Sequence, residues 1–149
     1  KLKFPIVGML YQKLYLSRIT DNFSTLLGSG IPMIRTFELS ANVVDNKIYE
    51  ELLLEVREEV RGGNTVSSAL SKSPEIPGIV VQMIKVGEET GEMSQILKTL
   101  ASFYRREVNN TVDSLVGLIE PIMIIVLGLG VGTLLGAVLI PIYNIAGSI

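Results

Sequence analysis

The chain has 149 residues, of which 13 are Lys or Arg and 15 are Asp or Glu, and it contains no Cys, His or Trp. Without Cys it forms no disulfide or thiolate metal centre, and without His it lacks the commonest general base and metal ligand. The net charge of −2 argues against nucleic-acid binding, which favours a basic excess. No carboxylates, Lys or Tyr stand at a recognisable catalytic spacing, so we expect neither enzymatic activity nor a cofactor or metal.

Charge is confined to the first part of the chain. All Lys, Arg, Asp and Glu residues lie between Lys1 and Glu120, whereas residues 121–149 carry no charge. The chain therefore divides into a charged, amphipathic part and an apolar tail. Because its first residue is not Met, we expect it to be a piece of a longer protein.

The charged part has the 3.6-residue period of amphipathic helices and almost no two-residue alternation. A first helical segment, residues 17–28, is stopped by Gly28 and Gly30, and Pro32 suits the first turn of a second helix. Asp45 or Asn46 is predicted to cap a third helix. The residues expected to face inward are Ile19, Phe23, Leu26 and Leu27; Met33, Ile34, Phe37 and Ala41; Ile48, Leu52, Val56 and Val60; Val66, Ala69 and Leu70; Ile79, Val80, Met83 and Ile84; and Met93, Ile96, Leu97, Leu100, Phe103, Tyr104 and Val108.

The third helix ends at the glycine pair 62–63, and its acidic outer face is interpreted as solvated, with metal binding as the alternative. A short helix, a fifth helix from about Pro77 to near Gly87 and a sixth after Gly91 complete the charged part. The sixth is expected to continue towards the apolar tail. Six helices joined by short loops predict an antiparallel bundle.

The segment from Gly87 to Glu92 is rich in acids, with Glu88 and Glu92 flanking Gly91. The pattern indicates a helix end and a tight glycine turn, followed by an acid where the next helix dipole favours it. The alternatives are a divalent-cation site or a docking point for a basic partner.

Residues 121–140 are apolar and, at about 1.5 Å per residue, match the roughly 30 Å hydrocarbon core of a bilayer. They predict a transmembrane helix that ends near Pro141, with Tyr143 at the far interface. Lys and Arg precede this span and none follows it, so the charged domain is expected in the cytoplasm and the C-terminus outside. Lys1 and Lys3 are expected to flank an earlier span.

Within the span, Gly128, Gly132 and Gly136 recur at every fourth residue and predict a smooth face for close helix packing. The partner is left open: another span of the same chain, a second copy, or a different membrane protein. Glu120 is either a solvated acid at a helix start or the partner of a basic group. Pro121 is a candidate kink between the sixth helix and the span.

Several segments, taken in order, resemble one protein family. They are Phe4–Gly8, Leu26–Pro32, Gly62–Leu70, Met83–Met93 and Leu118–Met123, with a span ending near Pro141. Together they resemble the GspF/PilC family, the inner-membrane platform proteins of bacterial type II secretion and type IV pilus systems.

The resemblance implies an all-α protein, a six-helix antiparallel cytoplasmic bundle followed by a single C-terminal transmembrane helix. It implies a juxtamembrane segment at residues 1–16, the bundle at 17–113, the span at 114–142 and a short extracytoplasmic tail at 143–149. The partner or packing candidates are Gly30, Pro32, Gly87, Glu88, Gly91, Glu92, Glu120, Pro121, Gly128, Gly132 and Gly136.

The function implied by the resemblance is non-enzymatic. Such a platform in the bacterial inner membrane couples a cytoplasmic hexameric ATPase to the extraction and polymerisation of pilin or pseudopilin subunits. It is expected to form homo-oligomers and to contact other inner-membrane assembly proteins. The alternatives are a tail-anchored helical adaptor or receptor and a carboxylate enzyme or transporter subunit. The sequence does not distinguish among secretion, pilus, DNA-uptake and adhesion-filament machines.

Overall fold

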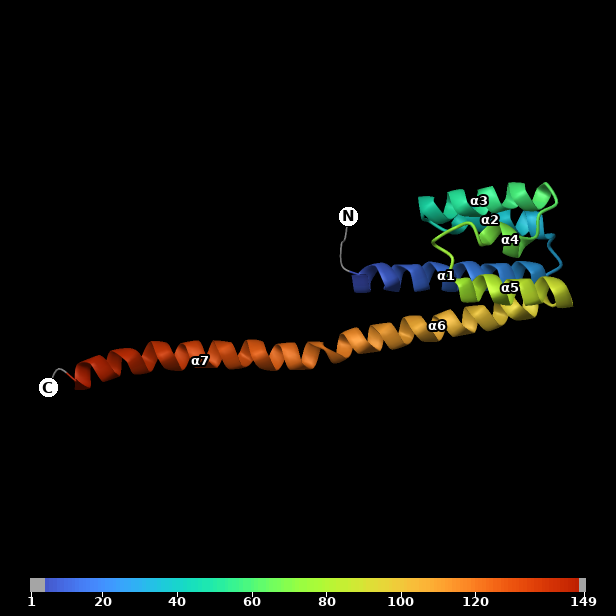
Figure 1. Ribbon diagram of the computed structural model, residues 1–149. Coiled ribbons are helices and arrows are strands. Elements are labelled where there is room, and N and C mark those ends of the chain that lie inside the picture. The colour runs from blue at the N-terminus through green and yellow to red at the C-terminus, as the bar shows by residue number, and fades with distance from the viewer. Residues whose placement is uncertain (1–4, 148–149) are drawn as a thin grey trace. The chain divides into compact units, whose positions relative to one another are not determined.

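The computed structural model describes residues 5–147, with side-chain surroundings from residue 8 onwards. These residues form seven α-helices (Figure 1): α1 Pro5–Gly28, α2 Met33–Val43, α3 Lys47–Arg61, α4 Val66–Leu70, α5 Gly78–Thr90, α6 Met93–Gly117 and α7 Ile119–Ala146. The predicted all-α architecture of six helices followed by one long apolar helix is confirmed. Lys1 and Lys3, expected to flank an earlier span, lie outside the described residues.

The chain divides into two compact units, Lys1–Asn109 and Asn110–Ile149. The first is called the helical unit below. Helix α1, in the first unit, begins at Pro5, well before the expected start at residue 17. The added turns belong to the domain, because Leu16 is buried in its core and the ring of Tyr15 stacks on that of Tyr49, with centroids 5.2 Å apart. The domain boundaries drawn from the sequence stay predictions.

The core of the first unit draws side chains from all six of its helices. Phe23 of α1 meets Phe37 of α2 edge to face, with ring centroids 4.8 Å apart. Its buried apolar cluster consists of Leu16, Phe23, Phe37, Ala41, Leu52, Leu53, Val56, Val66, Ala69, Leu70, Val80, Ile84, Leu97, Leu100 and Tyr104. The cavity among these side chains measures only about 40 Å³, so the interior is close-packed.

Three residues expected in the core are instead exposed: Ile48 by 59%, Ile79 by 55% and Phe103 by 42%. In α3 the expected Leu52 and Val56 are buried, but they are joined by Tyr49 and Leu53, whereas Ile48 is left outside the buried face. Each of these helices carries more apolar residues than one face holds, and the neighbouring helices decide which of them are covered.

Local signals account for the start of α3 and the end of α5. The side chain of Asn46, one of the two expected caps, accepts a hydrogen bond from the Ile48 amide at 2.9 Å. Helix α5 continues to Thr90, beyond the end expected near Gly87, because the left-handed residue that stops it is Gly91, with φ of 74°.

In the second unit, a turn at Leu118 separates α6 from α7, in place of the kink expected at Pro121. Pro121 lies in the first turn of α7, where its missing N–H costs no helical hydrogen bond. The helix also continues through Pro141 and ends at Ala146, beyond the expected end of the span. Its most apolar window has a mean hydropathy of 2.6 and none of it is buried within the structure, which indicates a membrane helix rather than a core helix.

Candidate functional site

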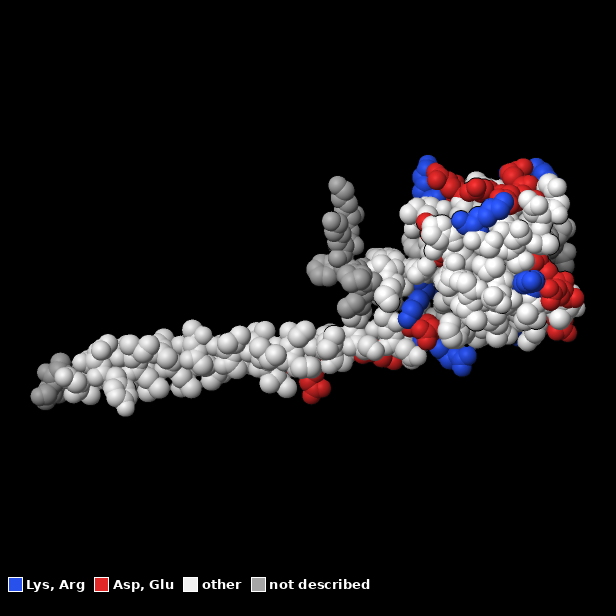
Figure 2. Space-filling view, in the orientation of Figure 1, with Lys and Arg blue, Asp and Glu red and all other residues white. Residues whose placement is uncertain are grey.

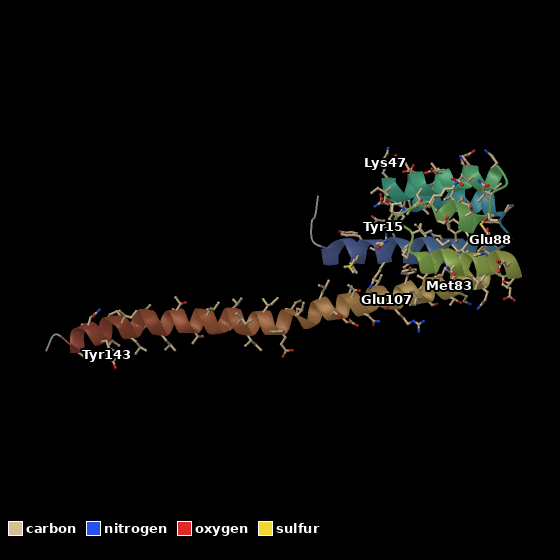
Figure 3. The ribbon with its side chains drawn as sticks, in the orientation of Figure 1. Tyr15, Lys47, Met83, Glu88, Glu107 and Tyr143 are labelled. Atoms are coloured by element: carbon tan, nitrogen blue, oxygen red, sulfur yellow. The ribbon has the colours of Figure 1, made fainter. Side chains whose placement is uncertain are left out.

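The carboxylate of Glu88, in the last turn of α5, binds the start of α4 (Figure 3). One oxygen accepts a hydrogen bond from the Val66 amide; the other accepts bonds from the Ser67 amide at 3.2 Å and the Ser67 hydroxyl at 2.5 Å. The Thr65 hydroxyl accepts a further bond from the Ser68 amide at 3.2 Å. The first amides of this short helix are therefore satisfied both locally and by a residue from another helix.

Gly87, next to this carboxylate, marks a close approach between α5 and α6. A Cβ atom there would lie 3.2 Å from the Met93 Cα and 3.3 Å from the Ile96 Cγ1, so a larger residue requires these neighbours to move by a few tenths of an ångström. The turn that follows depends on Gly91, whose φ of 74° is a left-handed conformation that favours glycine. Glu92 is exposed in this turn, and its carbonyl accepts the Ile96 amide at 3.1 Å.

Gly30 and Pro32 form the turn between α1 and α2. Gly30 has φ of 82°, and the Ile31 amide donates back to the Leu26 carbonyl at 3.1 Å. Pro32 precedes α2, and its carbonyl oxygen accepts hydrogen bonds from both the amide and the hydroxyl of the fully buried Thr36. Both residues therefore have a structural role in the turn.

Two serines join the end of α1 to the start of α6. Each hydroxyl of Ser24 and Ser94 donates to the other residue's carbonyl oxygen at 3.3 Å. The turns containing Gly30 and Gly91 therefore lie at the same end of the helical unit, as Figure 1 shows. No pattern in the sequence pointed to this serine pair, because its members are 70 positions apart.

The remaining predicted site residues lie in the second unit. Apart from the backbone of α7 itself, no described atom of this unit lies within 4 Å of a Cβ placed on Gly128, Gly132 or Gly136, so this face is open within the unit. Glu120 is exposed in the first turn of α7. It borders an otherwise mainly apolar groove of about 560 Å³, lined by Val116, Gly117, Ile119, Glu120, Met123, Ile124 and Leu127. None of the described residues of α7 is buried within the structure.

Three titratable side chains of the helical unit have shifted pKa values. Burial, aided by the negative charge of Glu75, raises the pKa of Tyr49 to about 12. Burial also raises the pKa of Tyr104, and the hydrogen bond from Arg35, at 2.6 Å, lowers the pKa of Glu38. Each of these shifts moves the pKa further from 7, the reverse of what a general acid or base requires. Within residues 5–147, no three acidic side chains are grouped as a metal site.

The family model described as "Type II secretion system (T2SS), protein F" matches residues 19–141, which include most of the helical unit and of α7. The chain belongs to this family. The family resemblance drawn from its motifs is thereby confirmed.

The relatives include proteins of pilus assembly and of secretion. The type IV pilus assembly protein PilC of Myxococcus xanthus is 34% identical over 148 residues, which are 99% of this chain and 36% of the relative. PilC of Thermus thermophilus is 32% identical over 150 residues, 100% of this chain and 37% of the relative. The type II secretion system protein F of Pseudomonas aeruginosa is 28% identical over 144 residues, 97% of this chain and 36% of the relative. The chain thus spans little more than a third of the length of these relatives.

Proposed function

We propose that the chain is part of a non-enzymatic platform in the bacterial inner membrane. It couples a cytoplasmic assembly ATPase to the extraction and polymerisation of pilin or pseudopilin subunits. The observation that carries this proposal is the family match, because it includes most of the helical unit and most of the apolar helix. Relatives named for pilus assembly and for type II secretion support both kinds of machine.

The physical properties of the two units suit such a role. A close-packed helical unit resists deformation and can therefore transmit force or displacement. Hydrogen bonds add to the apolar packing of this unit. Glu88 binds the start of α4, and the serine pair connects α1 with α6. An apolar helix of bilayer length anchors the chain. In this proposal the helical unit lies in the cytoplasm and the C-terminus lies outside.

The open face of α7 is proposed to pack against another membrane helix, in a homo-oligomer or in a pilin or pseudopilin. Three glycines at four-residue spacing leave room for a second backbone. Replacing Gly128, Gly132 and Gly136 together with Leu should abolish assembly. The matched variant replaces Leu127, Val131 and Leu135 with Ala and should assemble normally. Normal filament growth or secretion in the glycine variant would exclude this face from function.

The coupling role is tested by purifying the full-length protein from host membranes in a mild detergent and identifying its partners by mass spectrometry. Recovery of a hexameric ATPase together with pilin-like subunits is expected. Recovery of another soluble protein, with neither of these, would overturn the coupling role in favour of a tail-anchored adaptor.

A further inference from the structure

A groove of about 290 Å³ runs along α3 in the helical unit and is closed on its other side by the segment that follows α4. It is lined by Ile48, Glu51, Leu52, Glu55, Val56 and Glu59 of α3, and by Ala69, Lys72, Ser73, Pro74 and Glu75. Figure 2 shows acidic side chains gathered along the face of the unit that carries α3. Of its aliphatic lining residues, Leu52, Val56 and Ala69 are buried and Ile48 is exposed. The groove thus combines a concentration of carboxylates with a small apolar surface.

The spacing of these carboxylates is regular. Glu51, Glu55 and Glu59 follow one another at every fourth residue of α3, about 6 Å apart along the helix axis. Glu75 lies on the segment opposite. Like charges four residues apart on a helix repel each other, so this row favours a bound cation. Ile48, which is 59% exposed, adds an apolar contact at one end of the groove.

The groove already binds one basic side chain of its own chain. The Lys72 ammonium lies 2.7 Å from a carboxylate oxygen of Glu59, and the two side chains are 59% and 21% exposed. Within residues 5–147, Glu51, Glu55 and Glu75 form no ion pair of this kind, since the nearby Arg57 and Arg61 pair with Glu58. The contact made by Lys72 therefore shows how the rest of the row can bind a cation.

We propose that this groove binds a basic amphipathic helix of a partner protein. Lys or Arg side chains four residues apart in that helix would match the spacing of Glu51 and Glu55, and a third would meet Glu75. An apolar side chain between them would cover Ile48. The charge of the groove selects the partner and its apolar surface adds contact area. This inference does not depend on the proposed coupling role.

The test uses the full chain in an uncharged detergent and, as probe, a fluorescent synthetic helical peptide built from Lys, Leu and Ala. Because the chain has no Cys, Ile48→Cys introduces a single thiol in the groove that can carry a photo-crosslinker. Ile79→Cys, at a residue exposed to 55% outside the groove, is the matched control. The peptide is expected to crosslink at position 48 and not at position 79.

Charge variants decide whether the groove carboxylates cause the binding. The E51Q/E55Q variant should lower peptide affinity about fivefold, the effect of losing two exposed ion pairs. The control variant E50Q/E89Q removes two exposed carboxylates outside the groove lining and should change affinity less than twofold. Circular dichroism of each variant verifies the fold.

Three outcomes would overturn the proposal. Equal losses in both charge variants would show a general field effect rather than a site. Equal crosslinking of a peptide with Gln in place of Lys would show that charge is not recognised. Crosslinks at position 48 between two copies of the chain, undiminished by the peptide, would assign the groove to self-association.

Discussion

Removing the Glu88 carboxylate tests how much its hydrogen bonds between α5 and α4 stabilise the helical unit. Glu88→Ala leaves the amides of Val66 and Ser67 without this acceptor, together with the hydroxyl of Ser67, a residue exposed by only 7%. Helix α4 has five residues and depends on such bonds more than a long helix does. The variant is therefore expected to destabilise the helical unit without altering any apolar contact of the core cluster.

The size of this effect follows from the bonds that are lost. A hydrogen bond to a charged acceptor contributes about 1.5–3 kcal/mol, but such bonds are not additive. The loss of a helix cap costs about 1 kcal/mol. Because Glu88 is half-buried, water replaces part of what is lost. We expect Glu88→Ala to lower the free energy of unfolding by about 2 kcal/mol and Glu88→Gln, which keeps one acceptor oxygen, by about 1 kcal/mol.

Urea unfolding in an uncharged detergent measures this difference. Four of the five Tyr residues lie in the helical unit, so near-ultraviolet dichroism follows that unit rather than α7. Hydrogen exchange gives a local readout. The amides of Val66 and Ser67 should exchange about 30-fold faster in Glu88→Ala, the equivalent of 2 kcal/mol.

Glu89→Ala is the matched control, because Glu89 is adjacent in the sequence and exposed. It should change the unfolding free energy by less than about 0.5 kcal/mol. Equal stabilities of the Glu88 and Glu89 variants would refute the reasoning. So would additive effects of Glu88→Ala and Ser67→Ala, since two residues in direct contact should show a coupling energy of about 1 kcal/mol.

Three further predictions concern the stability of the same unit. Gly87→Ala should lower the free energy of unfolding in urea by about 1–3 kcal/mol, because its methyl group would meet the Met93 backbone. Gly78→Ala, at a position with open space around it, should be neutral or slightly stabilising. Equal effects of the two variants would contradict the close approach of α5 and α6. Gly91→Ala should cost about 1 kcal/mol in the same assay and Gly91→Asn less, because Asn tolerates a φ of 74° better; the reverse order would contradict the left-handed turn. The folded protein raises the pKa of Tyr49 to about 12, which means that folding favours the neutral phenol. The corresponding contribution to the free energy of unfolding, about 2–3 kcal/mol, is complete below pH 10 and is lost as the pH rises through 12. Alkaline unfolding curves should show a weaker pH dependence in Tyr49→Phe, and an unchanged slope would contradict this assignment.

Features that depend on near neighbours along the chain could be predicted from the amino-acid sequence. Helical periodicity, a cap at Asp45 or Asn46, the glycine turns at Gly30 and Gly91 and the long apolar helix were predicted, and the structure identifies Asn46 as the cap. These features arise from bonds and conformational preferences within a few residues, and the length of an apolar run is independent of folding. The motifs were also sufficient to indicate the family.

Which surplus apolar residues are covered, and which distant side chains meet, depends on how the helices pack against one another. The inward position of Tyr49 rather than Ile48 depends on how neighbouring helices pack around α3, which periodicity alone does not show. The Glu88 carboxylate finds its donors at positions 66 and 67, and the groove along α3 exists only because the segment after α4 lies beside it. Contacts between distant positions form when whole helices dock, and docking is decided by the combined packing of many side chains rather than by any local pattern.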